Sequence, residues 1–123
     1  MSTRCIQVVY IPDAKTLFAG DVLFTNFHPN MRDGDIPGWE NVLDGISAMD
    51  VTAIIPGHGP LSTKKDLQDM KQYLMTCERL GKELAGQGKD AQYIADEILK
   101  SVPKRAFFEM FVAGNVSAKY LTK

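Results

Sequence analysis

The sequence predicts an α/β domain with a small mixed sheet, a β-hairpin, a βαβ crossover and C-terminal helices. Near its start, two short segments rich in β-branched residues flank a turn, and an amphipathic helical pattern then precedes a continuous apolar segment. From there to the end of the chain, apolar residues recur at helical spacing. We expect a single domain over residues 1–123, because domains commonly contain about 100–150 residues.

The first two strands are expected to form an antiparallel hairpin. Residues 4–11 are rich in β-branched and aromatic side chains, and a turn follows at Pro12. Residues 16–19 predict a second, short strand that ends at residues 20–21. Residues 22–36 carry turn-forming residues throughout, which predicts a long irregular connection of the kind that is usually functional or disordered.

A helix and a third strand complete the predicted sheet. Pro37 suits the first turn of a helix, and residues 51–55 form a continuous apolar segment typical of a strand buried on both faces. A strand, a helix and a strand in this order predict a parallel pair. Asp21 and His58 would then follow the carboxyl ends of neighbouring strands, where open α/β sheets bind ligands. The apolar residues of the helix are Trp39, Val42, Leu43, Ile46 and Met49.

Three further helices are expected after this strand. Thr63 and Asp66 resemble a capping box at the start of a long helix that ends at Gly86. Asp90 can cap the next helix, and Pro103 is expected to begin the last. Three phenylalanines of this last segment are interpreted as core or dimer contacts, with a substrate-pocket wall as the alternative: Phe107, Phe108 and Phe111.

The composition is that of an ordinary soluble protein, with 45% hydrophobic and 24% charged residues. No segment reaches the roughly 18 apolar residues of a membrane span, and no apolar leader precedes a cleavage site, so we expect a cytoplasmic protein. Cys5 and Cys77 lack metal-type spacing and are interpreted as reduced core thiols. The net charge of −1, without a basic patch, argues against nucleic acid as a partner.

Two short motifs could carry chemistry, "FAGD" at residues 18–21 and "PGHG" at residues 56–59. In each, glycine permits a sharp turn and a close backbone approach beside one potential metal ligand, Asp21 or His58. Aspartate and neutral imidazole both bind zinc and other first-row metals, although an open site usually needs three protein ligands. Taken singly, a histidine in such a turn is more often a packing residue, and an aspartate after a strand more often caps a turn.

The motifs and their surroundings have a recognisable order. "VVYIPDAKTLFAGDVLF", then "HPNMRDGDIPGWENVLDGI", then "IIPGHGP" resemble the carboxy-terminal half of metallo-β-lactamase-fold hydrolases. In that family a hairpin ends in Gly-Asp, a tryptophan-bearing helix follows, and a buried strand ends in Pro-Gly-His-Gly. The resemblance covers residues 5–75 and leaves residues 76–123 as a helical extension. It implies half of an αββα sandwich.

The resemblance also implies roles for individual residues. Asp21 matches the metal-bridging aspartate of the family, and His58 matches its last histidine ligand. His28 lies in the loop that flanks the active site, although a turn histidine beside Pro29 is the favoured interpretation. Trp39 matches a position that looks structural. The family reaction is attack of a metal-bound hydroxide on an ester, thioester or amide bond.

The upstream His-x-His-x-Asp-His motif of the family does not occur in this sequence, which has only two histidines. We therefore expect the chain to be incomplete or inactive by itself, as a fragment or as one part of a split enzyme, with at most a weak zinc site. The alternative is a non-catalytic homodimeric binding or assembly module with a vestigial metal site. Half a sandwich would expose one sheet face, so we expect either a homodimer through that face or a missing N-terminal half to cover it.

Overall fold

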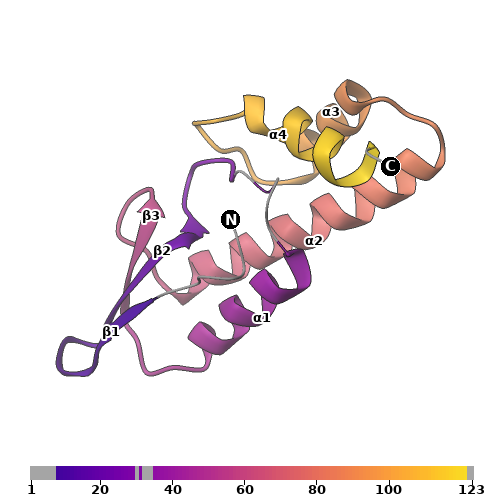
Figure 1. The fold of residues 1–123 in the computed structure, drawn as a ribbon. Helices are drawn as coiled ribbons and strands as arrows, with labels where there is room; N and C mark the ends of the chain where they lie inside the picture. Colours follow the sequence, from indigo (N-terminus) through magenta and orange to yellow (C-terminus); the bar gives the residue numbers. More distant parts are fainter. Residues whose placement is uncertain (1–7, 30, 32–34, 122–123) are drawn as a thin grey trace.

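The computed structural model describes residues 8–29, 31 and 35–121, which form one three-stranded sheet with helices beside it (Figure 1). The strand order is β1-β2-β3, so that β2 is central. β1 and β2 are antiparallel, whereas β2 and β3 are parallel and are connected through a helix. The predicted hairpin, βαβ crossover and α/β class are confirmed. The strands are β1 Val9–Ile11, β2 Thr16–Phe24 and β3 Ala53–His58.

The helices follow in the predicted order. A single 3-10 turn, η2 Pro12–Ala14, joins β1 to β2. In Figure 1 the sheet lies at the left, α1 and the long α2 pack beside it, and α3 and α4 lie above the far end of α2. A short π-helical segment, η3 Ser117–Leu121, follows α4 directly. The α-helices are α1 Ile36–Ser47, α2 Lys64–Gly86, α3 Ala91–Ser101 and α4 Met110–Val116.

Two of the helix starts are fixed by the capping residues that the sequence indicated. The carboxylate of Asp66 accepts a hydrogen bond of 2.9 Å from the backbone N–H of Thr63, just before α2. Asp90 accepts one of 2.8 Å from the N–H of Tyr93 at the start of α3. Each carboxylate satisfies a backbone donor that the helix itself leaves unpaired. The predicted end of α2 at Gly86 is also confirmed.

The main core lies between the sheet and α1 and α2. Leu17 of β2 and its neighbour Ile54 of β3 are fully buried on this inner face. Trp39 of α1 is also fully buried, and its indole N–H donates a 2.7 Å hydrogen bond to the carbonyl of Val22. Burial of such side chains stabilises the fold by about 1.5–3 kcal/mol each. The same core includes Leu43, Ile46, Leu67, Met70 and Leu74.

The opposite face of the sheet is apolar and exposed. Side chains alternate along a strand, so partners in register share a face, and Phe18 pairs with Val9 on one side and Ile55 on the other. Val9 is 58% exposed, and Ile11 and Phe18 are each 42% exposed. On β3 the outer-face residues Ala53 and Ile55 are half-buried within this chain, whereas Ile54 on the inner face is fully buried, so the expected burial of this strand on both faces is met only in part. We call this surface the outer sheet face: Val9, Ile11, Thr16, Phe18, Ala53 and Ile55.

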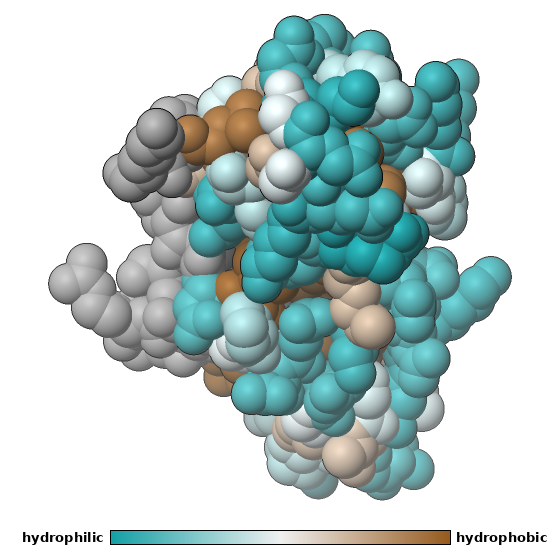
Figure 2. Space-filling model, turned by 90° about the vertical axis from the view of Figure 1, so that its right-hand side faces the viewer, coloured by the Kyte–Doolittle hydropathy of each residue, from teal (hydrophilic) through white to brown (hydrophobic). Residues whose placement is uncertain are grey.

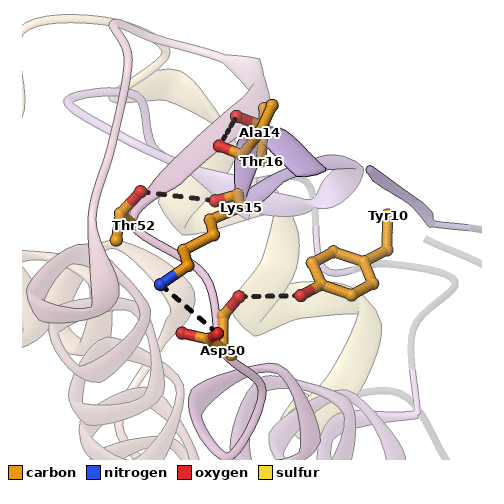
Figure 3. A network of polar contacts seen from close by, with 6 residues as sticks. All are labelled: Tyr10, Ala14, Lys15, Thr16, Asp50 and Thr52. Atoms are coloured by element: carbon orange, nitrogen blue, oxygen red, sulfur yellow. Dashed lines mark hydrogen bonds and ion pairs between the residues drawn. The ribbon is translucent and has the colours of Figure 1, made fainter. Parts of the chain in front are cut away.

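A polar network joins the β1–β2 turn to the connection between α1 and β3 (Figure 3). The hydroxyl of Tyr10 donates a 2.8 Å hydrogen bond to the carbonyl of Asp50, and the ammonium of Lys15 lies 3.5 Å from the Asp50 carboxylate. Lys15 adopts a left-handed backbone conformation, with φ of 48°, and its carbonyl accepts from the N–H of Thr52 at 2.8 Å. These contacts hold the two connections against each other at the end of the sheet far from residues 21 and 58.

Two boundaries differ from the expectation. β2 does not end at residues 20–21 but continues to Phe24, with an irregular register against β3 between Phe18 and Phe24. Its alternation also breaks there, since residues 20 and 21 are both exposed and residues 22–24 are all buried. Asp21 therefore lies inside β2, at a bulge of the kind that redirects side chains.

The last helix begins at Met110 rather than at Pro103. Phe107 instead forms a β-bridge with Phe27, and Phe108 has a left-handed φ of 68°, which a helix does not permit. The helical spacing of the phenylalanines was therefore misleading, because pairing with Phe27 holds this segment extended.

The helical side of the molecule is polar. Figure 2, which shows the side at the right of Figure 1, is mainly hydrophilic, with hydrophobic residues visible in small areas. Within the part of the chain that the structure describes, no helix has the length and apolar character needed to cross a membrane.

Candidate metal-ligand site

Asp21 and His58 lie side by side at one rim of the sheet. Asp21 extends from the bulge of β2, and His58 is the last residue of the neighbouring β3. The Asp21 Oδ1 and His58 Nε2 atoms are 3.9 Å apart, and the two side chains are 68% and 42% exposed. Two ligands of one zinc ion lie within about 4 Å of each other, because each binds at about 2.0–2.2 Å. The pair therefore fits two positions of a metal centre that solvent can reach.

The glycines on either side of His58 allow this approach. A Cβ atom at Gly57 would lie 2.6 Å from Asp21 Oδ1 and 2.7 Å from the carbonyl oxygen of Gly20. A Cβ atom at Gly59 would overlap the carbonyl oxygen of Thr25, and Gly59 has a φ of 112°. The predicted role of glycine in close backbone approach is confirmed, since any side chain here would separate the two strands.

His58 lies on a short loop that the chain closes by itself. Ile54 and Ser62 exchange two backbone hydrogen bonds of 2.9 and 2.8 Å at the base of this loop. Near the tip, the carbonyl of His58 accepts from the N–H of Thr25 at 2.9 Å. The Ser62 hydroxyl donates to the carbonyl of Pro60. The Ser62 hydroxyl oxygen can therefore accept a hydrogen bond from the Thr25 hydroxyl, at 2.8 Å. The loop is thus fixed to the end of β2.

Three aromatic rings surround the imidazole of His58. Phe24 stacks on it, with a centroid distance of 5.1 Å and an interplanar angle of 14°. Phe27 is tilted against it at 5.6 Å, and Phe108 meets it edge-on at 5.8 Å. These contacts restrict the ring to one orientation while its Nε2 atom stays on the side of Asp21.

His28 does not join this pair. The loop that carries His28 contacts His58 through the ring of Phe27. The His28 side chain itself is buried, with 1% exposure, and its Nδ1 atom lies 2.8 Å from the hydroxyl of Tyr73 on α2. Burial, and secondarily the charge of Arg105, lower the pKa of His28 below its ordinary value. His28 is therefore a neutral interior residue in the irregular segment beside Pro29, which is consistent with its interpretation as a turn histidine rather than a ligand.

Two polar residues that the sequence analysis missed hold the loop after β2. Arg105 donates through Nη1 to the carbonyls of Phe24 and Phe27, at 2.6 and 2.8 Å. Asn115 donates to the carbonyl of Pro29 at 2.8 Å and accepts from the N–H of Met31 at 2.7 Å. A signal was present for Asn115, because it lies between two valines of an apolar helix stripe and so requires partners. No comparable signal marked Arg105.

No complete metal site is present in the described part of the chain, where no group of three or more His, Cys, Asp or Glu side chains could hold an ion. Cys77 is a free thiol buried in the core, as its interpretation as a reduced core thiol predicted, and burial raises its pKa to about 12. Cys5 lies outside the described residues.

Comparison with known families supports the interpretation of the motifs. Residues 2–58 match the family model of the metallo-beta-lactamase superfamily. This segment contains both Asp21 and His58, and the resemblance inferred from the sequence is confirmed. The division of the chain into residues 5–75 and 76–123 stays a prediction.

A solved structure gives the same result for the fold. The chain is similar to a double mutant of the sec-alkyl sulfatase PisA1, with a TM-score of 0.65 and 17% sequence identity. The similarity covers 93% of this chain, but the chain spans only 22% of the length of that structure. No match was found among curated proteins. The chain therefore has part of a metallo-β-lactamase-like fold.

Proposed function

We propose that this chain forms part of a metal-dependent hydrolase of the metallo-β-lactamase superfamily and supplies Asp21 and His58 as two ligands of its metal centre. The observation that carries the proposal is the 3.9 Å approach of Asp21 Oδ1 and His58 Nε2, in a rim where Gly57 and Gly59 admit no side chain. The match of residues 2–58 to the superfamily supports it.

The proposed reaction is hydrolysis of an ester, thioester or amide bond. A metal ion bound here supplies Lewis acidity and lowers the pKa of a water ligand. The chain's own contribution is positional: Asp21 provides a carboxylate oxygen, and His58 provides a nitrogen on a ring held by Phe24. Because an open zinc site usually has three protein ligands, the remaining ligands must come from another polypeptide segment.

Zinc titration followed by calorimetry tests this proposal. The chain should bind zinc weakly, and His58→Ala and Asp21→Ala should each lower the affinity by about tenfold or more. Asp50→Ala is a matched control, because the Asp50 carboxylate is similarly exposed, at 75%, and Asp50 precedes β3 whereas His58 is the last residue of that strand. If both ligand variants bind zinc as the unmodified chain does, the pair is not a metal site.

The outer sheet face supports a second proposal, about the partner. We infer that a second copy of the chain covers this face and packs sheet against sheet around a two-fold axis. Three of its apolar side chains, Val9, Ile11 and Phe18, are between 42% and 58% exposed. A contiguous apolar surface of this kind usually marks an interface. The alternative function is a non-catalytic assembly module, because the described residues of each copy bring only Asp21 and His58 together.

Sedimentation velocity of the isolated chain tests the dimer. We expect a dimer at micromolar concentration that Phe18→Lys dissociates and Met75→Lys leaves intact. Phe18 and Met75 are equally exposed, at 42% and 44%, but Met75 lies on α2. A stable monomer would contradict the proposal and leave the face to the complementary part of a larger fold. A zinc-free protein that remains a dimer would favour the assembly module.

A further inference from the structure

A partly buried cation, the guanidinium of Arg105, holds the loop that leaves β2. Arg105, which lies between α3 and α4, donates from one nitrogen, Nη1, to the carbonyls of Phe24 and Phe27. The two acceptors bracket the turn at residues 25–26, where Asn26 has a left-handed φ of 65°. One side chain therefore sets the separation between the two ends of this turn.

The same two residues carry rings that contact the proposed metal ligand. Phe24 stacks on the imidazole of His58 at 5.1 Å, and Phe27 is tilted against it at 5.6 Å. The backbone of the turn is also bonded to His58, through the N–H of Thr25. Any shift of the turn therefore moves both rings and a hydrogen-bond donor relative to His58.

Arg105 is itself held in place by contacts that depend on its planar group. Its guanidinium carbon lies 4.7 Å from the ring centroid of Tyr73, whose hydroxyl is bonded to His28. Burial lowers the pKa of Arg105. A guanidinium is so strongly basic that the group nevertheless stays charged. The charge is met by two carbonyl oxygens, an aromatic face and the attraction of the Asp66 and Asp69 carboxylates. Lysine cannot reproduce that combination of stacking and directed donors.

We propose that Arg105 is a positioning residue for His58, which sets the orientation of the imidazole through Phe24 and Phe27. The inference extends the proposed function, because the oriented ring is the proposed metal ligand. It also gives the segment after α3 a role in the site, because the orientation of His58 then depends on a residue about 50 positions further along the chain.

The orientation of His58 can be measured without metal. The ring-proton chemical shifts of His58 report its position over the Phe24 ring, which a purely stabilising residue elsewhere would not change. In Arg105→Ala these resonances should move toward those of an unstacked histidine. Added guanidinium chloride, far below the concentrations that unfold proteins, should restore them, whereas sodium chloride at equal ionic strength should not.

A second variant and a control keep the test decisive. Arg105→Lys retains the charge and should stay folded, but His58 should still lose its stacked resonances. Arg79→Ala removes an exposed arginine of α2 and should leave them unchanged. If either folded Arg105 variant gives the same His58 shifts as Arg79→Ala, Arg105 does not position the ring.

Zinc titration then separates the two proposals. If Arg105 positions a metal ligand, Arg105→Lys should bind zinc about 10–100-fold more weakly than the unmodified chain, the usual effect of removing an orienting contact. If His58 moves as expected but the unmodified chain binds no zinc, the positioning role stands and the proposed metal centre fails. If zinc binds and His58 does not move, only the positioning role is overturned.

Discussion

The strand part of the molecule, up to His58, and the helical part, from α2 onward, contribute differently to the candidate site. Asp21 and His58 come from the strands and are 68% and 42% exposed. The polar residues that hold the surrounding loop come from α2 and the segments after it, where Tyr73 and Asn115 are buried and Arg105 is partly buried. Exposed residues of the strand part are available for chemistry, while buried residues of the helical part fix their geometry.

The largest effect is expected in the core of the strand part. Trp39→Ala should lower the free energy of unfolding by about 3–5 kcal/mol, because it removes a fully buried ring and leaves the carbonyl of Val22 without its donor. Urea unfolding monitored by circular dichroism measures the change. Met75→Ala, on an exposed site of α2, should change stability by no more than about 0.5 kcal/mol. Equal losses in both variants would remove the distinction between core and surface.

The next effect concerns the glycine beside the ligand. Gly59→Ala should cost at least about 1–3 kcal/mol, because alanine disfavours a φ of 112° and its Cβ would overlap the carbonyl of Thr25. Gly45→Ala is the matched control in α1, where a Cβ atom meets nothing within 4 Å. That variant should instead be more stable by about 0.5–1 kcal/mol. Thermal unfolding of both proteins would test whether the two substitutions differ in sign.

A third substitution tests how the C-terminal segment packs on α2. Alanine at Gly81 improves helix propensity by about 1 kcal/mol, but its Cβ would overlap the ring of Tyr120, and overpacking costs about 1–3 kcal/mol. Gly81→Ala should therefore destabilise the chain slightly. In a Tyr120→Ala background the same change should stabilise it, since the ring is gone. A double-mutant cycle in urea gives the coupling, and a value near zero would show that the ring does not pack there.

The smallest effect is the pH dependence contributed by His28. Its pKa is lowered in the folded state, so the unfolded chain binds a proton first as the pH falls below 6.5. Stability is therefore fully present above pH 6.5 and decreases below it, by at most about 1.4 kcal/mol per pH unit from this group. Urea unfolding at about pH 7.5 and about pH 5.5 should show a smaller difference for His28→Gln than for the unmodified chain. An unchanged difference would show that His28 is not protected from protonation.

Much of the strand part was predictable from local patterns. The hairpin turn at Pro12, the amphipathic stripe around Trp39 and the two glycine motifs are short-range signals, and they correctly brought Asp21 and His58 to one rim. The bulge in β2 and the late start of α4 were missed, because long-range pairing of Phe24 with His58 and of Phe27 with Phe107 determines them. Tertiary context overrode the local pattern in both places.

Arg105 and His28 show a second limit of sequence reasoning. Both sit in segments without clear periodicity, and their partners, Phe24 and Tyr73, are far away along the chain. A buried polar residue can be identified from sequence only when its neighbours form a regular apolar stripe, as they do around Asn115.

The reciprocal hydrogen bonds between Ile54 and Ser62 have a consequence for the thermodynamics of ligand capture. They close the His58 loop before any ion arrives, so the conformational entropy of ordering this loop is lost during folding. If a metal ion binds at Nε2 as proposed, binding then requires little further ordering, which favours affinity as preorganisation does in any receptor. Amide hydrogen exchange at Ile54 and Ser62 should accordingly be slow in the metal-free protein, at the rate of the sheet rather than of a surface loop.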